Sequence, residues 1–200
     1  MANQDAPFGF RAIGGTGSSY MTQGTSRYEI SDNWTNAIYQ GDLVGAGDGS
    51  ATDRAGTTSV KGYIFGSIAA THLNLGVFNG CYYIDPTTAK PTWKNYYPGA
   101  VNITTGTIAA YCYDNPQQLY EAQTAGTLTQ TDVGSLIDQA TYVAGSAING
   151  HSKSELHTAS KVTTGQFRIV RTANDAANND ASVLNSNQIV QISPAASISN

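Results

Sequence analysis

The sequence predicts an all-β fold: an antiparallel β-barrel or sandwich-like single domain with an extended N-terminal arm and one short helix. Charged residues make up only 12% of the chain, about half the roughly 25% that is usual for soluble domains. Gly, Ser, Thr and Asn fill the difference, and these residues favour turns and strands over helix interiors. Short aromatic and β-branched runs recur between turn signals at intervals of about ten residues, which is typical of small barrels and sandwiches.

The length of 200 residues suits one domain with an arm. We expect residues 1–25 to form the arm and residues 26–200 to form a single β-rich domain. The arm is rich in Gly, Ser and Thr, but it carries an apolar island at 7–13 that includes Phe8 and Phe10. Because so short a segment cannot build a core, we expect it to order against the body or a partner.

Strand signals follow one another along the rest of the chain. An apolar patch at 34–39 leads into the segment 41–44, and polar loops are expected at 45–56 and 172–182. Residues 145–164 are polar and predicted to be irregular, while 141–143 could return to strand. The strands are expected at 27–30, 58–69, 77–84, 93–97, 108–113, 119–123, 166–171 and 187–193.

The single helical candidate is segment 131–140. Thr131 can cap the first turn, and Val133, Leu136 and Ile137 share a face at helical spacing. Gly134 weakens this prediction.

The densest core is expected within residues 76–126, which contain both cysteines and many of the aromatic residues. Cys81 and Cys112 lie on two predicted strands, where buried free thiols in a reducing compartment are the expected state. A disulfide remains open if the two strands are neighbours. The spacing offers no zinc site, because there is no CxxC and no histidine pair nearby.

Several function classes lack their usual signals. The net charge of −4 and the absence of a Lys/Arg cluster argue against nucleic-acid binding, and no apolar run approaches membrane-helix length. Residues 1–10 have no apolar core of a signal peptide. The glycine-rich 14–19 segment lacks a P-loop lysine, and 48–53 lacks the acidic spacing of a calcium loop. With no HExxH and no GxSxG, we expect no enzyme, cofactor or metal.

A series of landmarks follows in order along the chain: APFGFRAI (6–13), RYEISDNWTNAIYQGDLV (27–44), GVFNGCYYID (76–85), WKNYYPG (93–99), AYCYDNPQQLYEAQTAG (110–126) and TQTDVGSLID (129–138). Taken in this order, the series resembles a group of small structural proteins of tailed bacteriophages that decorate or cement the capsid. Arg11-Ala12 departs from the arginine-proline pair that this group carries in its arm.

The resemblance implies a non-enzymatic virion protein on the outer capsid surface, present in the host cytoplasm during assembly. Its partner would be the major capsid protein, and a homo-oligomer, trimer or dimer, would sit on a local symmetry axis. We hypothesise that the arm residues Phe8, Phe10 and Arg11 contact the capsid.

Two alternatives remain open. The first is another virion component: a tail, connector or fibre subunit. The second is a carbohydrate-binding module in which an exposed Trp34, Trp93 or Tyr96 stacks on sugars.

Overall fold

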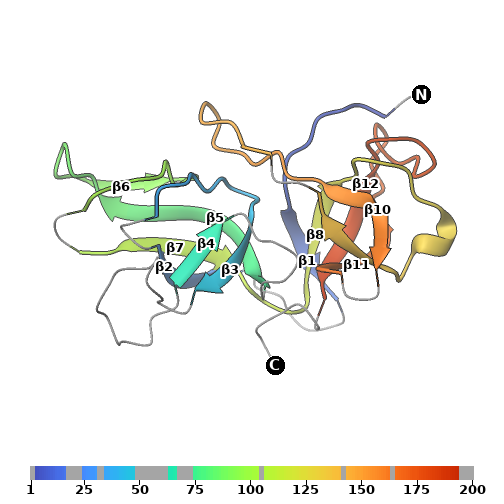
Figure 1. Ribbon diagram of the computed structural model, residues 1–200, viewed down its shortest axis with the longest axis horizontal. Coiled ribbons are helices and arrows are strands. Elements are labelled where there is room, and N and C mark those ends of the chain that lie inside the picture. Colours follow the sequence, from blue (N-terminus) through green and yellow to red (C-terminus); the bar gives the residue numbers. More distant parts are fainter. Residues whose placement is uncertain are drawn as a thin grey trace.

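The computed structural model confirms an all-β protein (Figure 1). It describes residues 3–16, 24–30, 34–47, 63–66, 74–103, 106–140, 143–162 and 165–193. The strands form two sheets that lie side by side as two lobes.

The first lobe, called here the ring lobe, contains the strands that lie between residues 26 and 113. Their pairings close a ring, in which β3 pairs with β4, β4 with β2, β2 with β7, β7 with β5, and β5 with β3, while β6 extends β5 outward. The β2–β4 pairing is parallel, and the others are antiparallel. The strands are β2 (Ser26–Ile30), β3 (Leu43–Gly47), β4 (Tyr63–Gly66), β5 (Asn74–Ile84), β6 (Pro91–Lys94) and β7 (Ile108–Tyr113).

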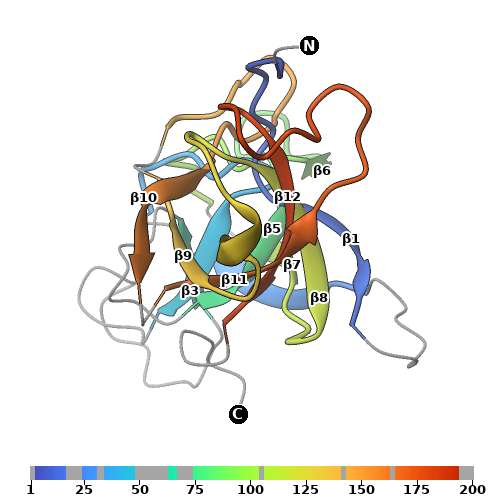
Figure 2. The ribbon, with the colours of Figure 1, turned by 90° about the vertical axis from the view of Figure 1, so that its right-hand side faces the viewer.

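The second lobe is a curved sheet with strand order β1-β8-β12-β11-β9-β10 (Figure 2). All the pairings along this order are antiparallel. A single 3₁₀ turn, η1 (Gln130–Asp132), precedes β9. The strands are β1 (Arg11–Gly15), β8 (Gln118–Gln123), β9 (Leu136–Gln139), β10 (Leu156–Val162), β11 (Phe167–Thr172) and β12 (Asn187–Ile192).

The chain starts in the second lobe, builds the ring lobe and then returns. Gly15 at the end of β1 lies opposite Gln118 at the start of β8. The Thr16 amide donates a 2.9 Å hydrogen bond to the Gln117 carbonyl. The ring lobe is therefore formed by a segment inserted between β1 and β8, and the two ends of this segment lie side by side.

Each lobe has a buried core, and the cores adjoin. The ring-lobe core includes both cysteines with Phe78, Tyr83 and Tyr97. The core of the second lobe draws on strands from both ends of the chain and also includes Leu43 and Val77 from β3 and β5. The segment 76–126 therefore dominates only the ring-lobe core.

Cys81 and Cys112 are buried and free, as expected. Burial raises the pKa of the Cys81 thiol to about 12 and raises that of Cys112 well above its ordinary value. Both residues pack as small apolar groups.

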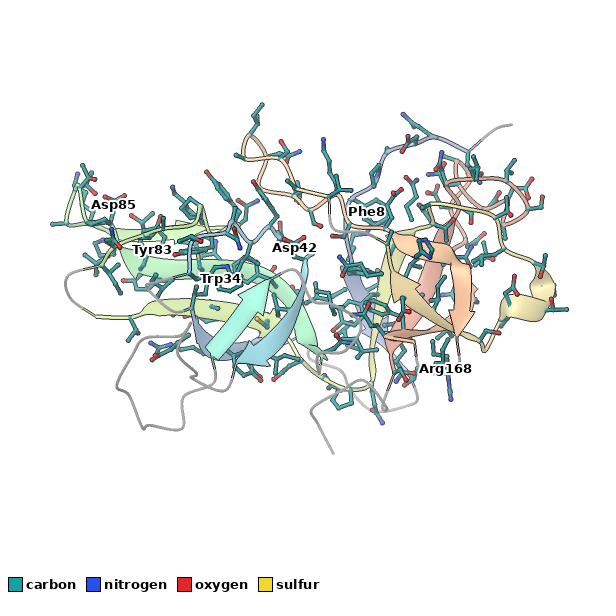
Figure 3. The ribbon with its side chains drawn as sticks, in the orientation of Figure 1. Phe8, Trp34, Asp42, Tyr83, Asp85 and Arg168 are labelled. Carbon is teal, nitrogen blue, oxygen red and sulfur yellow. The ribbon has the colours of Figure 1, made fainter. Side chains whose placement is uncertain are left out.

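The turn signal after β5 produces the β5–β6 hairpin. The Asp85 carboxylate accepts hydrogen bonds from the backbone amides of Thr87 and Thr88, and these bonds lower the pKa of this carboxyl. Ala89 completes the turn in the left-handed region at φ 56°. The hairpin projects at the far end of the ring lobe, where Figure 3 labels Asp85.

The predicted helix at 131–140 is wrong. Thr129, rather than Thr131, begins a single 3₁₀ turn, in which its amide and hydroxyl donate to Asp132. Gly134 at φ +89° ends that turn, and β9 follows. This segment is a strand because its pairing with β10 and β11 outweighs the helical spacing of three apolar residues. Ile137, in the middle of the three strands, is fully buried.

One further expectation needs correction, since strand β10 lies within the segment expected to be irregular. The arm, expected to order against the body or a partner, orders against the body, and its residues 11–15 form strand β1. Both sequences are poor in apolar residues, and both are held by ladders to the neighbouring strands β8 and β9. The 48–53 segment lies outside the described residues, as do residues 17–19 of the glycine-rich 14–19 segment.

Candidate functional site

Phe10, predicted to contact a partner, is instead a core residue. Its side chain is 1% exposed, and its ring stacks on Phe167 of β11 with 4.4 Å between centroids. Its amide donates a 2.9 Å hydrogen bond to the Gly41 carbonyl of the ring lobe. The apolar island therefore closes this protein's own core, which leaves Phe10 unavailable to a partner in the folded chain.

Phe8 and Arg11 remain partly accessible. The guanidinium of Arg11 lies 4.8 Å from the centre of the Phe8 ring and forms an ion pair with Glu121 of β8. The Arg11 side chain is 61% exposed, whereas Phe8 is half-buried beside it at the near edge of the second lobe (Figure 3). Contact of these two residues with a capsid stays a prediction.

The segment before β1 is anchored along its length. The side chain of Asn3 donates to the carbonyls of Asp180 and Leu184. The amide of Gln4 donates to Asn178, and that of Ala6 donates to Gln123. Residues 3–10 are thus tied to the second lobe rather than extended away from it.

An exposed aromatic cluster lies on the ring lobe. Tyr82 and Ile84 of β5 point outward, because they alternate with the buried Cys81 and Tyr83. Trp93 of β6 is paired with Tyr82 and is 52% exposed. We call the set Tyr82, Ile84, Trp93 and Tyr111 the aromatic face.

Gly80 explains how this face is built. Strand β5 runs between β6 and β7, and Gly80 pairs with Tyr111. A side-chain Cβ at position 80 would approach the Trp93 ring to 2.7 Å. Because Gly80 has no side chain, the indole crosses β5 and meets Tyr111, with 5.2 Å between ring centroids and planes tilted by 53°.

The other two aromatic residues predicted to stack on sugars lie elsewhere. Trp34 is half-buried against the ring-lobe core. Tyr96 stacks on Tyr39 at 5.8 Å, and the Lys94 ammonium lies over its ring. Sequence reasoning selected Trp93 but missed Tyr82 and Ile84, although the alternation along β5 would have indicated them.

The Asp42 carboxyl is sealed from solvent. It is 1% exposed and lies on the side of the ring lobe that faces the second lobe (Figure 3). Burial raises its pKa to about 6, although the hydroxyls of Ser152 and Ser154 and the Tyr39 amide donate to it. Since both serines are also buried, this group joins the lobes rather than presenting a nucleophile to a substrate.

The described part of the chain contains no cluster of three or more His, Cys, Asp or Glu side chains arranged to hold a metal ion. Within the same residues, no helix has the length and apolar character needed to cross a membrane. Comparisons with protein-family models, curated proteins and solved structures find no match. The aromatic face therefore stands on its geometry alone as the candidate functional site.

Proposed function

We propose that this protein is a non-enzymatic structural protein of a phage virion that binds the outer surface of the capsid and stabilises it. The aromatic face is the observation that carries the proposal. The aromatic face, with Trp93 at its centre, replaces Phe10 as the proposed contact with the capsid. Two supports add to it: the ordered landmarks of the sequence, and an all-β scaffold that holds the face rigidly on paired strands.

The physical argument is that large aromatic side chains dominate binding at protein interfaces. Tyr and Trp offer a wide apolar area with few rotatable bonds, and they concentrate among the residues that lose most affinity when truncated. Trp93 is further ordered by its contact with Tyr111 and by its pairing with Tyr82. Binding to the assembled shell in preference to free subunits would stabilise the shell by mass action. A dimer or trimer on a symmetry axis would multiply the contact.

The first test places the protein on the particle. Gold-labelled antibody against the purified protein should decorate phage heads evenly in electron micrographs of the source lysate. Label confined to a tail or vertex would favour the connector, tail or fibre alternative, and particles without label would contradict a virion role.

The second test isolates the aromatic face. Particles that lack the protein are incubated with the purified chain, and the bound fraction is measured by sedimentation. Tyr82→Ala with Trp93→Ala should weaken binding by a factor on the order of 30, equivalent to about 2 kcal/mol. Leu184→Ala is the control, because Leu184 is 54% exposed in the other lobe. Equal loss in both variants would contradict the assignment.

A second candidate function is carbohydrate binding, which the half-exposed Trp93 beside Tyr82 and Tyr111 also favours. Titration of tryptophan fluorescence with polysaccharides separates the two functions. A saturable change that disappears in Trp93→Ala would support the sugar site, and an unchanged spectrum would leave the capsid contact.

A further inference from the structure

A pocket of about 420 Å³ lies where the two lobes meet. One side is formed by the N-terminal segment at Pro7–Phe8 and by the start of β1, the other by β5 and by loop residues 146–153. Its volume falls in the range of roughly 300–1,000 Å³ that is usual for ligand sites, which often occur at such junctions. It is separate from the aromatic face, since none of the four residues of that face lines it.

The inner surface of the pocket is largely apolar. Val77 and Phe78 of β5 line it together with Tyr113 of β7 and with Phe8 and Phe10. Phe10, Val77 and Phe78 are core residues with at most 1% exposure, and they hold the wall from behind. The apolar surface that a ligand can reach comes from the half-buried Phe8, Ala12 and Tyr113, and it would receive an aromatic or branched aliphatic group.

The charged residues of the pocket are all basic. Arg11 and Lys153 line it together with His151, and no aspartate or glutamate does. The chain as a whole carries a net charge of −4. A basic pocket on an acidic protein selects an anionic ligand, because the potential in a partly enclosed site is set by its own lining.

Lys153 is the cation available to a ligand. Arg11 is already paired with Glu121, whereas Lys153 is exposed and has no ion-pair partner among the residues that the structure describes. Its backbone is held firmly: the Ser152 amide donates to the Gln40 carbonyl at 2.9 Å, and the Ser154 amide donates to the Ser152 hydroxyl at 3.0 Å. Lys153 therefore lines the pocket from a segment that hydrogen bonds of its two neighbours anchor.

We propose that this junction pocket binds an apolar carboxylate, that is, an aromatic or branched aliphatic body that carries one negative charge. The body lies on the apolar surface made by Phe8, Ala12 and Tyr113, and the carboxylate pairs with Lys153. Two sources share this chemistry: a free carboxylic acid, and an acidic residue next to a large apolar residue in a peptide. The inference does not rest on the capsid function.

The test measures ligand-induced chemical-shift changes in the full-length protein by NMR. The probes are 3-phenylpropionate as the free acid, 3-phenylpropan-1-ol as its neutral analogue, and acetyl-Asp-Phe-amide as the peptide form. For a body of this size we expect a Kd of about 1 mM or lower for 3-phenylpropionate. The alcohol should bind up to about fivefold more weakly, since an exposed charge pair is worth up to about 1 kcal/mol.

Variants locate the site. Lys153→Gln should weaken 3-phenylpropionate about fivefold and leave the alcohol unchanged. Lys90→Gln is the matched control, because Lys90 is an exposed lysine in the β5–β6 turn. Ser146→Phe places a ring in the pocket while retaining the backbone bonds of Ser146, and it should abolish binding by all the probes. Circular dichroism confirms that each variant is folded.

The outcomes either identify the source of the ligand or overturn the proposal. Binding of 3-phenylpropionate alone supports a free acid as the ligand, and binding of the peptide, with or without it, supports a peptide source. Equal affinity for acid and alcohol, equal loss in the two lysine variants, or no binding by any probe would overturn the proposal.

Discussion

The two lobes are closed in different ways. The ring lobe takes its strands from a continuous stretch of chain, residues 26–113, and seals them by pairing β3 with β5. The second lobe takes β1 from one end of the chain and β8 to β12 from the other, and it borrows Leu43 and Val77 for its core. One lobe is thus complete within its own sequence, whereas the other depends on remote segments and on its neighbour.

Truncation of Phe10 should have the largest effect, because it removes a remote segment's main contribution to the second lobe. We expect Phe10→Ala to lower the free energy of unfolding by about 3–5 kcal/mol, and Phe8→Ala, at a half-buried site, by about 1 kcal/mol. Urea titration followed by circular dichroism measures both values.

The same titration tests whether the lobes unfold together. Both tryptophans, Trp34 and Trp93, belong to the ring lobe, so their fluorescence reports that lobe alone. Because Leu43 and Val77 join the cores, fluorescence and circular dichroism should shift by the same amount in Phe10→Ala. A fluorescence transition that stays in place would show independent lobes.

Asp42 at the junction should produce the next largest effect, one that depends on pH. Its pKa is about 6 in the folded protein, against 3.8 for an unperturbed carboxyl. The folded state therefore binds more protons than the unfolded state between these values, and this group adds stability as the pH falls from 7 to 4. The difference of about two pKa units corresponds to about 3 kcal/mol.

Asp42→Asn removes this titration. We expect the difference in unfolding free energy between wild type and variant to change by about 3 kcal/mol between pH 7 and pH 4. Other groups titrate equally in both proteins and cancel. A difference that is constant with pH would contradict the raised pKa.

Gly80 offers a smaller effect confined to the ring lobe. In Gly80→Ala the new methyl group would lie 2.7 Å from the Trp93 ring and 2.9 Å from the Lys94 carbonyl. We expect a loss of about 1–3 kcal/mol from overpacking, together with a change in tryptophan emission. In a Trp93→Ala background the same substitution should cost less, and an unchanged cost would exclude the indole as its cause.

The smallest effect is expected at the tip of the hairpin. Ala89 has φ 56°, a conformation that glycine adopts without strain. Ala89→Gly should therefore stabilise the protein by about 0.5–1 kcal/mol in thermal unfolding. Ala147, in an exposed turn without positive φ, is the control, and Ala147→Gly should destabilise. A loss of stability at both sites would show that Ala89 is not strained.

Sequence patterns predicted the ring lobe better than the second lobe, for a physical reason. Asp85-Pro86 and Asp114-Asn115-Pro116 end strands by local turn chemistry, so the bounds of β5 and β7 can be predicted from nearby residues. Strand β1 owes its existence to β8, more than a hundred positions away. Local sequence preferences do not indicate pairing with a strand so far away. The prediction therefore assigned Phe10 to contact with another protein rather than to the core of this one.

The candidate site was predictable only in part. Trp93 is a natural candidate because of its size, but its position across β5 depends on Gly80, whose role appears only when β6 and β7 flank β5. The junction pocket has no local signal at all. Its lining comes from the N-terminal segment, β5 and the 146–153 loop, which only the tertiary fold brings together.

The meeting of Thr16 and Gln117 has a consequence for how such a chain can be modified. The chain between these residues, which includes the ring lobe, is an insertion in the second lobe, and its two ends are hydrogen-bonded to each other. A replacement segment of another length could begin and end at the same two residues, provided that it supplies apolar groups equivalent to Leu43 and Val77 and the junction hydrogen bonds of Gly41 and Asp42. Exchange of the ring lobe by recombination would therefore have to conserve the surface that faces the second lobe.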